Sequence, residues 1–212
     1  ASCLVGSEMC IRDRCSWCWG FAPVVEALAT QAAERGVPMQ LVLGGLRRDQ
    51  VAIDAAARVR YLGYWQAVNA STGQLFNFDE GLPLGMRYDT EPACRAVVTV
   101  RDLDPQSAWP MARRIQQAFY QQGADVTLPA TLVQLAEEVG IPRIEFAEAF
   151  DSEAQHRATA ADFTWVQDLG IAGFPTLLAE SAGRLALLTN GYQPLDVLSP
   201  LLGRWLEHAV DG

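Results

Sequence analysis

Two cysteines separated by two residues, Cys15 and Cys18, are the pair in this chain whose types and spacing could do redox chemistry. When the second cysteine lies one helical turn after the first, the two thiols can close a disulfide. The start of a helix also offers unpaired N–H groups and the positive end of the helix dipole, which lower the pKa of the outer thiol. The spacing therefore predicts that Cys15 is the attacking sulfur and Cys18 the resolving sulfur.

The residues after the pair predict the helix that this chemistry needs. Over 19–36 (WGFAPVVEALATQAAERG) apolar residues recur at helical spacing, and most of the others are good helix formers. Gly36 stands where a glycine cap would end the helix, and Pro23 interrupts it. A short apolar strand follows over 39–43, so a strand before Cys15 would complete a β-α-β unit.

The middle of the chain is predicted to be helical and its end to return to strands. Residues 74–89 are rich in Gly, Pro and Asn and predict a loop, and 181–183 predict a turn between two antiparallel strands. Helices are expected at 54–70, from a cap at Thr90, and at 104–122, 129–139, 142–150, 152–169 and 194–209, with strands at 176–180 and 184–189.

Composition excludes several classes of protein. The 212 residues are 50% hydrophobic, enough for one large domain or two small ones. The net charge is −9 with no basic run, so nucleic acid and anionic membrane are poor partners. No apolar run reaches the roughly 18 residues of a membrane span. Five cysteines, four of them within the first 18 residues, are not the framework of a disulfide-stapled secreted domain.

Residues 1–14 carry a different signal. The text CLVGSEMCIRDR resembles adaptor-derived read-through at the ends of some metagenomic gene fragments, and four charged residues break any signal-peptide core. We therefore expect this segment to form at most a short, poorly packed strand, with no selected chemistry at Cys3 or Cys10. The alternative is a genuine N-terminal strand with residues 9–11 as its core.

The order of elements, with the motifs it carries, resembles a known family. A β-α-β half with Cys-x-x-Cys at the helix start, a helical insertion and a β-β-α half are similar to the DsbA family of the thioredoxin fold. Residues 170–176 (GIAGFPT) resemble the family's loop before the third strand, in which the proline is cis and faces the cysteine pair. Residues 15–21 (CSWCWGF) resemble a bacterial subgroup known as predicted protein-disulfide isomerases.

The resemblance implies an α/β thioredoxin fold with a large all-helical insertion between its two halves. Residues 1–48 and 163–212 would form the thioredoxin-like domain, and 49–162 the insertion, packed as a cap over the cysteines. The loop at 74–89 would border the substrate groove. Pro175, Phe174 and Trp17 would bind substrate, the bulk of Phe174 narrowing the groove.

The expected activity is that of a protein disulfide oxidoreductase or isomerase acting through a mixed disulfide. Its partners would be protein or peptide thiols and disulfides, with glutathione as a further candidate, and no metal or prosthetic group is implied. Ser-Trp stands between the cysteines where DsbA has Pro-His, so Cys15 should be less acidic than in that oxidase. The direction of electron flow stays open. The absence of a signal-peptide core favours the cytoplasm, with the periplasm as the alternative.

Three other functions stay open on the residues alone. A glutathione-dependent isomerase or transferase of the DsbA-like fold is one, although such relatives typically carry Ser at the first position of the pair. A plant-type [2Fe–2S] site could use the spacing Cys10-x₄-Cys15-x₂-Cys18 with Cys94 as a fourth ligand. A zinc site would need four ligands, but there is no second Cys-x-x-Cys. Cys94 is predicted to be a buried helical thiol, and the two histidines receive no role.

Overall fold

A four-stranded sheet organises the fold, in a computed structural model that describes the backbone of residues 5–11, 15–45 and 48–210 and the side chains of 15–45 and 52–207. The strands run in the order β2-β1-β5-β6. β1 (Val5–Ile11) is parallel to β2 (Met39–Leu43) and antiparallel to β5 (Thr176–Ser181), and β6 (Arg184–Asn190) is antiparallel to β5. This is the topology of the thioredoxin fold.

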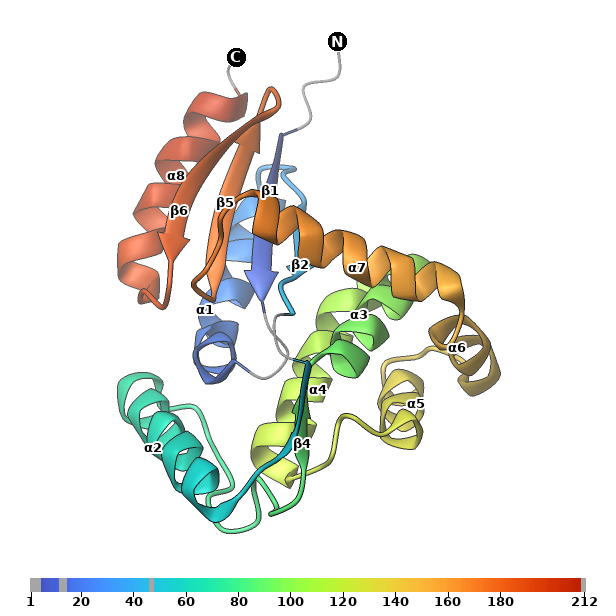
Figure 1. Cartoon of the computed structure of the whole chain (residues 1–212). Helices are drawn as coiled ribbons and strands as arrows, with labels where there is room; N and C mark the ends of the chain where they lie inside the picture. The colour runs from blue at the N-terminus through green and yellow to red at the C-terminus, as the bar shows by residue number, and fades with distance from the viewer. Residues whose placement is uncertain (1–4, 12–14, 46–47, 211–212) are drawn as a thin grey trace.

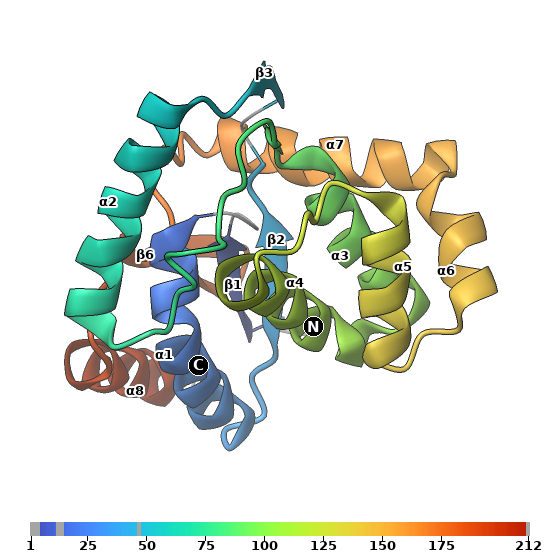
Figure 2. The same cartoon turned by 90° about the horizontal axis from the view of Figure 1, so that it is seen from below.

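Helices cover both faces of the sheet. α1 (Ser16–Ala33) and α8 (Leu195–Val210) pack together on one face, and α7 (Glu153–Asp168) crosses β2 on the other (Figures 1 and 2). The chain thus runs β1-α1-β2 before the insertion and β5-β6-α8 after it. The predicted α/β thioredoxin fold with a helical insertion is confirmed.

The expectation that residues 1–14 form at most a short strand is wrong. β1 has seven residues and occupies the inside of the sheet, where Cys10 is paired with Val42 on one side and Thr176 on the other. Its backbone joins the two halves of the fold, because β2 and β5 have no direct pairing in the sheet order. Local charge pattern misled the prediction, since a central strand is stabilised by pairing with segments far along the chain.

The insertion contains a small sheet as well as helices. β3 (Arg48–Ala52) pairs with β4 (Arg87–Asp89) through an irregular antiparallel register, and the sequence predicted neither strand. Three helices lie within two residues of their predicted bounds: α2 (Ala55–Thr72), α5 (Pro129–Glu138) and α6 (Arg143–Phe150). α3 (Glu91–Leu103) follows Thr90 as expected, whereas the helix predicted at 104–122 begins with a 3₁₀ turn, Pro105–Ser107, and continues as α4 (Ala108–Gln122). The domain boundaries at 48/49 and 162/163 stay a prediction.

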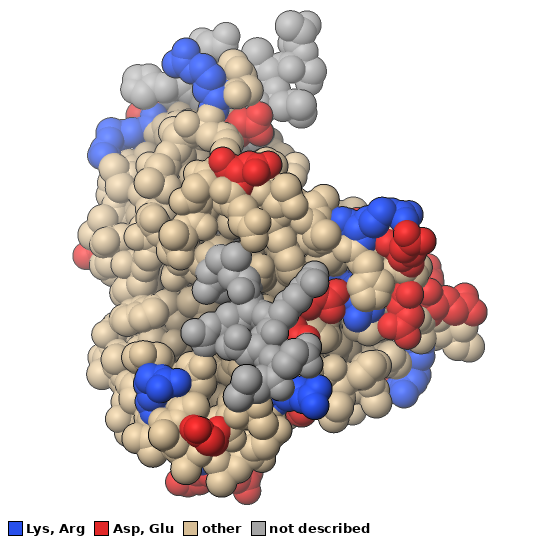
Figure 3. Space-filling view, in the orientation of Figure 1, with Lys and Arg blue, Asp and Glu red and all other residues tan. Residues whose placement is uncertain are grey.

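One hydrophobic core runs from the thioredoxin half into the insertion. Its buried residues include Phe21 and Leu28 of α1, Leu43 of β2, and Met111 and Phe119 of α4. Arg95 of α3 is a buried charged residue at this core, 7% exposed, with its guanidinium over the ring of Phe150. On the face in Figure 3 acidic and basic residues are interspersed, most densely where α6 and α7 meet. Among the described residues, no helix is long and apolar enough to cross a membrane.

Candidate active site

Cys15 and Cys18 occupy two different environments at the start of α1. Cys15 is the N-cap residue with extended backbone (φ −90°, ψ 112°), and its carbonyl accepts hydrogen bonds from Cys18 N at 2.9 Å and Trp19 N at 3.1 Å. Cys15 is half-buried, whereas Cys18 is 3% exposed. The first turn of α1, all of it described, contains no acidic residue, so no carboxylate there offsets the positive end of the helix dipole. The outer cysteine is thus the more exposed of the two and lies at the positive end of the helix.

The loop that enters β5 lies against the cysteine pair. The Phe174–Pro175 peptide bond is cis, as the sequence predicts. The Cys15 thiol donates to the Phe174 carbonyl with Sγ 3.6 Å from the oxygen, and the Pro175 carbonyl accepts from Gly191 N at 2.7 Å. Two segments almost 160 residues apart in the chain are therefore brought together, and the loop presents backbone groups to Cys15.

The ring of Phe174 does not take the position that the sequence suggests. Phe174 is only 8% exposed, and its ring lies where a side chain on Gly44 would be. Because the ring fills this space beyond the end of β2, the group that Phe174 presents to Cys15 is its backbone carbonyl. The expectation that the bulk of Phe174 narrows the groove has no support in this geometry.

Trp17, the third expected substrate contact, is half-buried beside an aromatic residue that no sequence pattern indicated. Its ring centroid lies 5.6 Å from that of Tyr192 in a tilted arrangement, and Tyr192 meets Phe21 edge to face at 6.0 Å. Tyr192 follows the Asn190-Gly191 turn after β6, and no pattern in the sequence connects this turn with the cysteines. Trp17 and Tyr192 together form an aromatic wall next to the pair.

Trp19 is buried and connects the insertion to the first turn of α1 through two hydrogen bonds. It is 2% exposed, its Nε1 donates to the Leu75 carbonyl at 3.1 Å, and its carbonyl accepts from Gln74 Nε2 at 3.0 Å. The start of the predicted 74–89 loop therefore does lie beside α1. Of the loop's apolar residues, Leu82 is buried at 1% and Leu84 is 64% exposed, so they do not form one common wall.

The candidate metal ligands are not assembled among the side chains that the structure describes. In that part of the chain no three His, Cys, Asp or Glu side chains gather as a metal site. Cys94 is buried on α3, as predicted, and His156 Nδ1 lies 3.3 Å from Glu91 Oε1. The iron–sulfur alternative depends on Cys10, and the side chains of Cys10 and His208 lie outside the described residues.

Comparisons with known proteins agree with this geometry. A family model described as a DSBA-like thioredoxin domain matches residues 14–203. A candidate protein disulfide isomerase from Nitrosomonas europaea is 38% identical, with a TM-score of 0.90, covering 96% of this chain and 98% of that one. Among curated proteins, no relative matches this chain.

Two further solved structures extend the comparison. The cytosolic disulfide reductase DsbM from Pseudomonas aeruginosa is 28% identical (TM-score 0.78; 94% and 98% of the two chains), and a second structure of it holds GSH. A 2-hydroxychromene-2-carboxylate isomerase is only 13% identical with a TM-score of 0.65, a likeness of fold over 97% and 98% of the two chains. With its cysteine pair at a helix start and its cis-proline loop, the chain belongs to the DSBA-like thioredoxin domain family.

Proposed function

We propose that this protein is a thiol–disulfide oxidoreductase in which Cys15 is the nucleophile and Cys18 the resolving thiol. The observation that carries the proposal is the pairing of a half-buried N-cap cysteine with an almost fully buried one a turn later. Only the first sulfur can meet a protein disulfide without unfolding of α1, and the helix N-terminus favours its thiolate.

The reaction follows from these positions. The Cys15 thiolate attacks one sulfur of the substrate disulfide, that S–S bond breaks, and the other substrate sulfur leaves as a thiolate. Cys18, deprotonated in turn, then attacks the Cys15 sulfur of the mixed disulfide. This second exchange releases the substrate as a dithiol and leaves a Cys15–Cys18 disulfide, so two electrons pass from protein to substrate. An external thiol must restore the reduced pair.

Backbone groups beside Cys15 would hold the substrate. We assign this role to the loop of Phe174 and Pro175, whose carbonyl at residue 174 already accepts from the Cys15 thiol. Trp17, with Tyr192 beside it, would cover the residues flanking the substrate cysteine. Protein disulfides, which present an extended chain around the cysteine, fit such a groove.

Reduction or isomerisation is the direction we favour, with glutathione as the regenerating thiol. Two features support this choice: no histidine stands between the cysteines to hold the thiolate, and DsbM, 28% identical, is a disulfide reductase solved with GSH. A reductase of this kind would work in a reducing compartment such as the cytoplasm.

Two cysteine variants test the mechanism. Cys15→Ser removes the nucleophile and should abolish reduction of insulin, whereas Cys18→Ser should accumulate a mixed disulfide at Cys15, seen as a mass adduct that dithiothreitol releases. Cys94→Ser is the control, because this buried thiol on α3 has no part in the exchange. Insulin reduction that survives Cys15→Ser would refute the assignment. Undiminished turnover of glutathione conjugates by Cys18→Ser would instead indicate the glutathione-dependent isomerase.

A further inference from the structure

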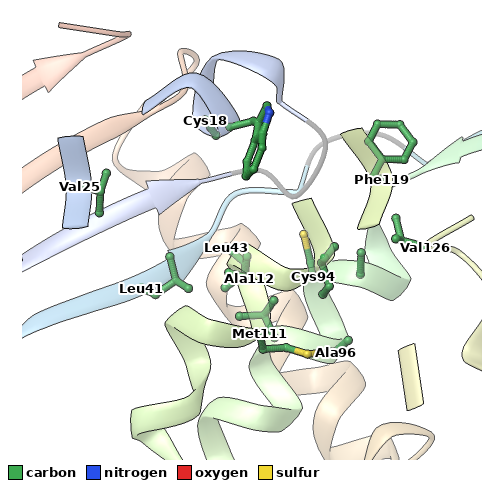
Figure 4. Packing of buried hydrophobic residues seen from close by; sticks show 14 of the residues in the cluster. Cys18, Val25, Leu41, Leu43, Cys94, Ala96, Met111, Ala112, Phe119 and Val126 are labelled. Atoms are coloured by element: carbon green, nitrogen blue, oxygen red, sulfur yellow. The ribbon is translucent and has the colours of Figure 1, made fainter. Parts of the chain in front are cut away.

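A cavity of about 370 Å³ opens along the flank of α1, between this helix and α4. Cys18, Val25 and Ala29 line it from α1, and Trp109 and Ala112 from α4; Figure 4 shows Cys18 and Val25 on the one helix and Ala112 on the other. Cys15, Phe174 and Pro175 are not among its lining residues. The cavity is therefore separate from the proposed substrate groove and reaches the cysteine pair from the side of the buried sulfur.

A buried amide lies in this mainly apolar wall. Gln116 of α4 lines the cavity although it is only 3% exposed. Within the described part of the chain, no protein group hydrogen-bonds to its side chain. Gln116 is not among the side chains whose polar atoms are sealed off without a partner, so its amide is open to the cavity. A polar group placed in this way can hydrogen-bond to a molecule that the cavity holds. Gln116 would donate to an oxygen of that molecule.

The charges at the cavity compensate one another. Arg113 Nη1 of α4 lies 2.8 Å from Glu26 Oε1 of α1, so an ion pair connects the two helices. The angle at this contact is too far from linear for a hydrogen bond. The guanidinium also lies over the ring of Trp19, 5.7 Å from its centroid. Among the described residues that line the cavity, Arg113 is the cation and Glu26 the anion, and the two are paired. The cavity therefore has no net charge to attract an ion. Pockets lined mainly by apolar side chains with a few placed polar groups bind mainly apolar molecules and orient them through those groups.

We propose that the α1–α4 cavity binds a neutral, mainly apolar small molecule that carries one carbonyl group, with the carbonyl on Gln116 and the apolar body against Cys18. The volume is near the lower end of ligand pockets, which suits a molecule of one or two rings or a short acyl chain. A ligand in this place covers Cys18 without covering Cys15. Binding at this site does not depend on the proposed redox activity.

Prodan, a neutral aminonaphthalene ketone whose emission shifts to the blue in apolar surroundings, is the probe. The full-length protein should bind it saturably with such a blue shift. Gln116→Leu keeps the volume but removes the amide, and it should weaken binding about 2- to 12-fold, the range of one neutral hydrogen bond. Dimethylaminonaphthalene, which lacks the ketone, should bind the native protein and Gln116→Leu equally. Equal loss of both probes in this variant would overturn the role of the carbonyl.

Two substitutions by Phe, one inside the cavity and one outside it, test whether Prodan binds in this cavity or on another apolar surface. Ala29→Phe places a ring in the cavity and should abolish Prodan binding, whereas Ala70→Phe, on an exposed position of α2, should leave it unchanged. In Cys15→Ser, saturating Prodan should also protect Cys18 from alkylation, read by peptide mass mapping. Prodan bound as tightly by Ala29→Phe, or Cys18 labelled at the same rate with and without the probe, would overturn the proposal. Insulin reduction, measured in parallel, reports the redox proposal separately.

Discussion

Cys15 and Cys18 lie one helical turn apart and have different surroundings. Cys15 caps the helix and meets the Phe174 carbonyl, while Cys18 turns into the core that α1 shares with α4. In the mechanism that we propose, a substrate meets the Cys15 sulfur first. The Cys18 sulfur would act only after a mixed disulfide has formed at Cys15, so that the positions of the two thiols would set the order of attack.

The close approach of Phe174 to Gly44 gives a test of the loop. Gly44→Ala adds a Cβ that would overlap the Phe174 ring, so the ring must move and should disturb the carbonyl of the same residue beside Cys15. We expect lower stability and slower insulin reduction. Gly63→Ala is the matched control: this helical glycine of α2 has open space around it, and alanine should stabilise by about 0.5–1 kcal/mol. Urea unfolding and the reductase assay measure both, and a Gly44→Ala protein as stable and active as the native one would contradict the arrangement.

Cys3 and Cys10 test whether the first segment has chemistry beyond its strand. The double variant Cys3→Ser/Cys10→Ser should reduce insulin at the native rate, because our mechanism uses neither thiol. Iron content, measured by absorbance and metal analysis of the native protein, provides the second readout. Loss of activity in the double variant together with bound iron would favour the iron–sulfur alternative.

At the residue scale, the sequence predicts what depends on local spacing. The Cys15–Cys18 interval and the Gly-Phe-Pro-Thr run are short patterns, and the structure brings them together as expected. Tyr192 and Gly44 escaped prediction because their place at the site arises from β6 and β2 meeting the loop in space. Contacts of this kind cannot be predicted from the spacing of residues along the chain.

At the scale of elements, the insertion is attached to the thioredoxin half at two places. Gly20 lets α2 come close, since a Cβ there would lie 2.7 Å from Val68 Cγ1. On the far side, Asp162 of α7 accepts from Leu43 N of β2 at 2.9 Å and forms a two-point pair with Arg101 of α3. The insertion is thus attached at the end of β2 as well as at the start of α1.

Replacing the Asp162 carboxylate by a neutral group should therefore lower the free energy of unfolding. Burial alone would lower the pKa of Arg101, but the hydrogen bond and charge of Asp162, together with the charge of Asp102, outweigh it and raise that pKa. Asp162→Asn leaves the partly buried guanidinium without its anion, and we expect a loss of about 2–3 kcal/mol in urea unfolding. Glu137→Gln, which breaks an exposed pair with Arg143, is the control and should cost less than about 1 kcal/mol. Equal, small losses in both variants would show that the pair does not hold the elements together.

Glu138 predicts a pH dependence for the contact between α4 and α5. Hydrogen bonds from Gln134 and then from Arg114 lower the pKa of Glu138 below its ordinary value of 4.5. A lowered pKa in the folded state stabilises the fold above pH 4.5, and this stabilisation is lost as the pH falls through the folded-state value. Glu138→Gln should therefore be less stable than the native protein at neutral pH, with the difference vanishing in acid. A difference in unfolding free energy that grows towards low pH would contradict the assignment.

Periodicity explains which elements the sequence predicts. The helices have apolar stripes at helical spacing, which can be recognised within one segment. β1, β3 and β4 lack such an internal signal, because each is stabilised by a strand far along the chain. β4 has only three residues, too few for an alternation to be visible. The missed strands are therefore those that depend most on distant partners.

At the scale of the whole molecule, the reduction potential decides the direction of the reaction. We expect a value closer to that of thioredoxin, about −270 mV, than to that of DsbA, about −120 mV, because no histidine stabilises the reduced pair as a thiolate. Equilibration with glutathione buffers, followed by alkylation and mass spectrometry, measures it. Cys94→Ser should show the same potential. A value near that of DsbA would favour an oxidase.

The central place of β1 has a consequence for how the polypeptide folds during synthesis. The partner of Cys10 on β5 is Thr176, so more than 160 residues must be made after β1 before that edge can pair. β1, α1 and β2 can associate early, but one inner strand edge then stays uncovered while the insertion is translated. Such an edge is prone to pairing with other chains. A ribosome that pauses within the insertion would therefore display an unfinished sheet and an accessible pair of thiols together.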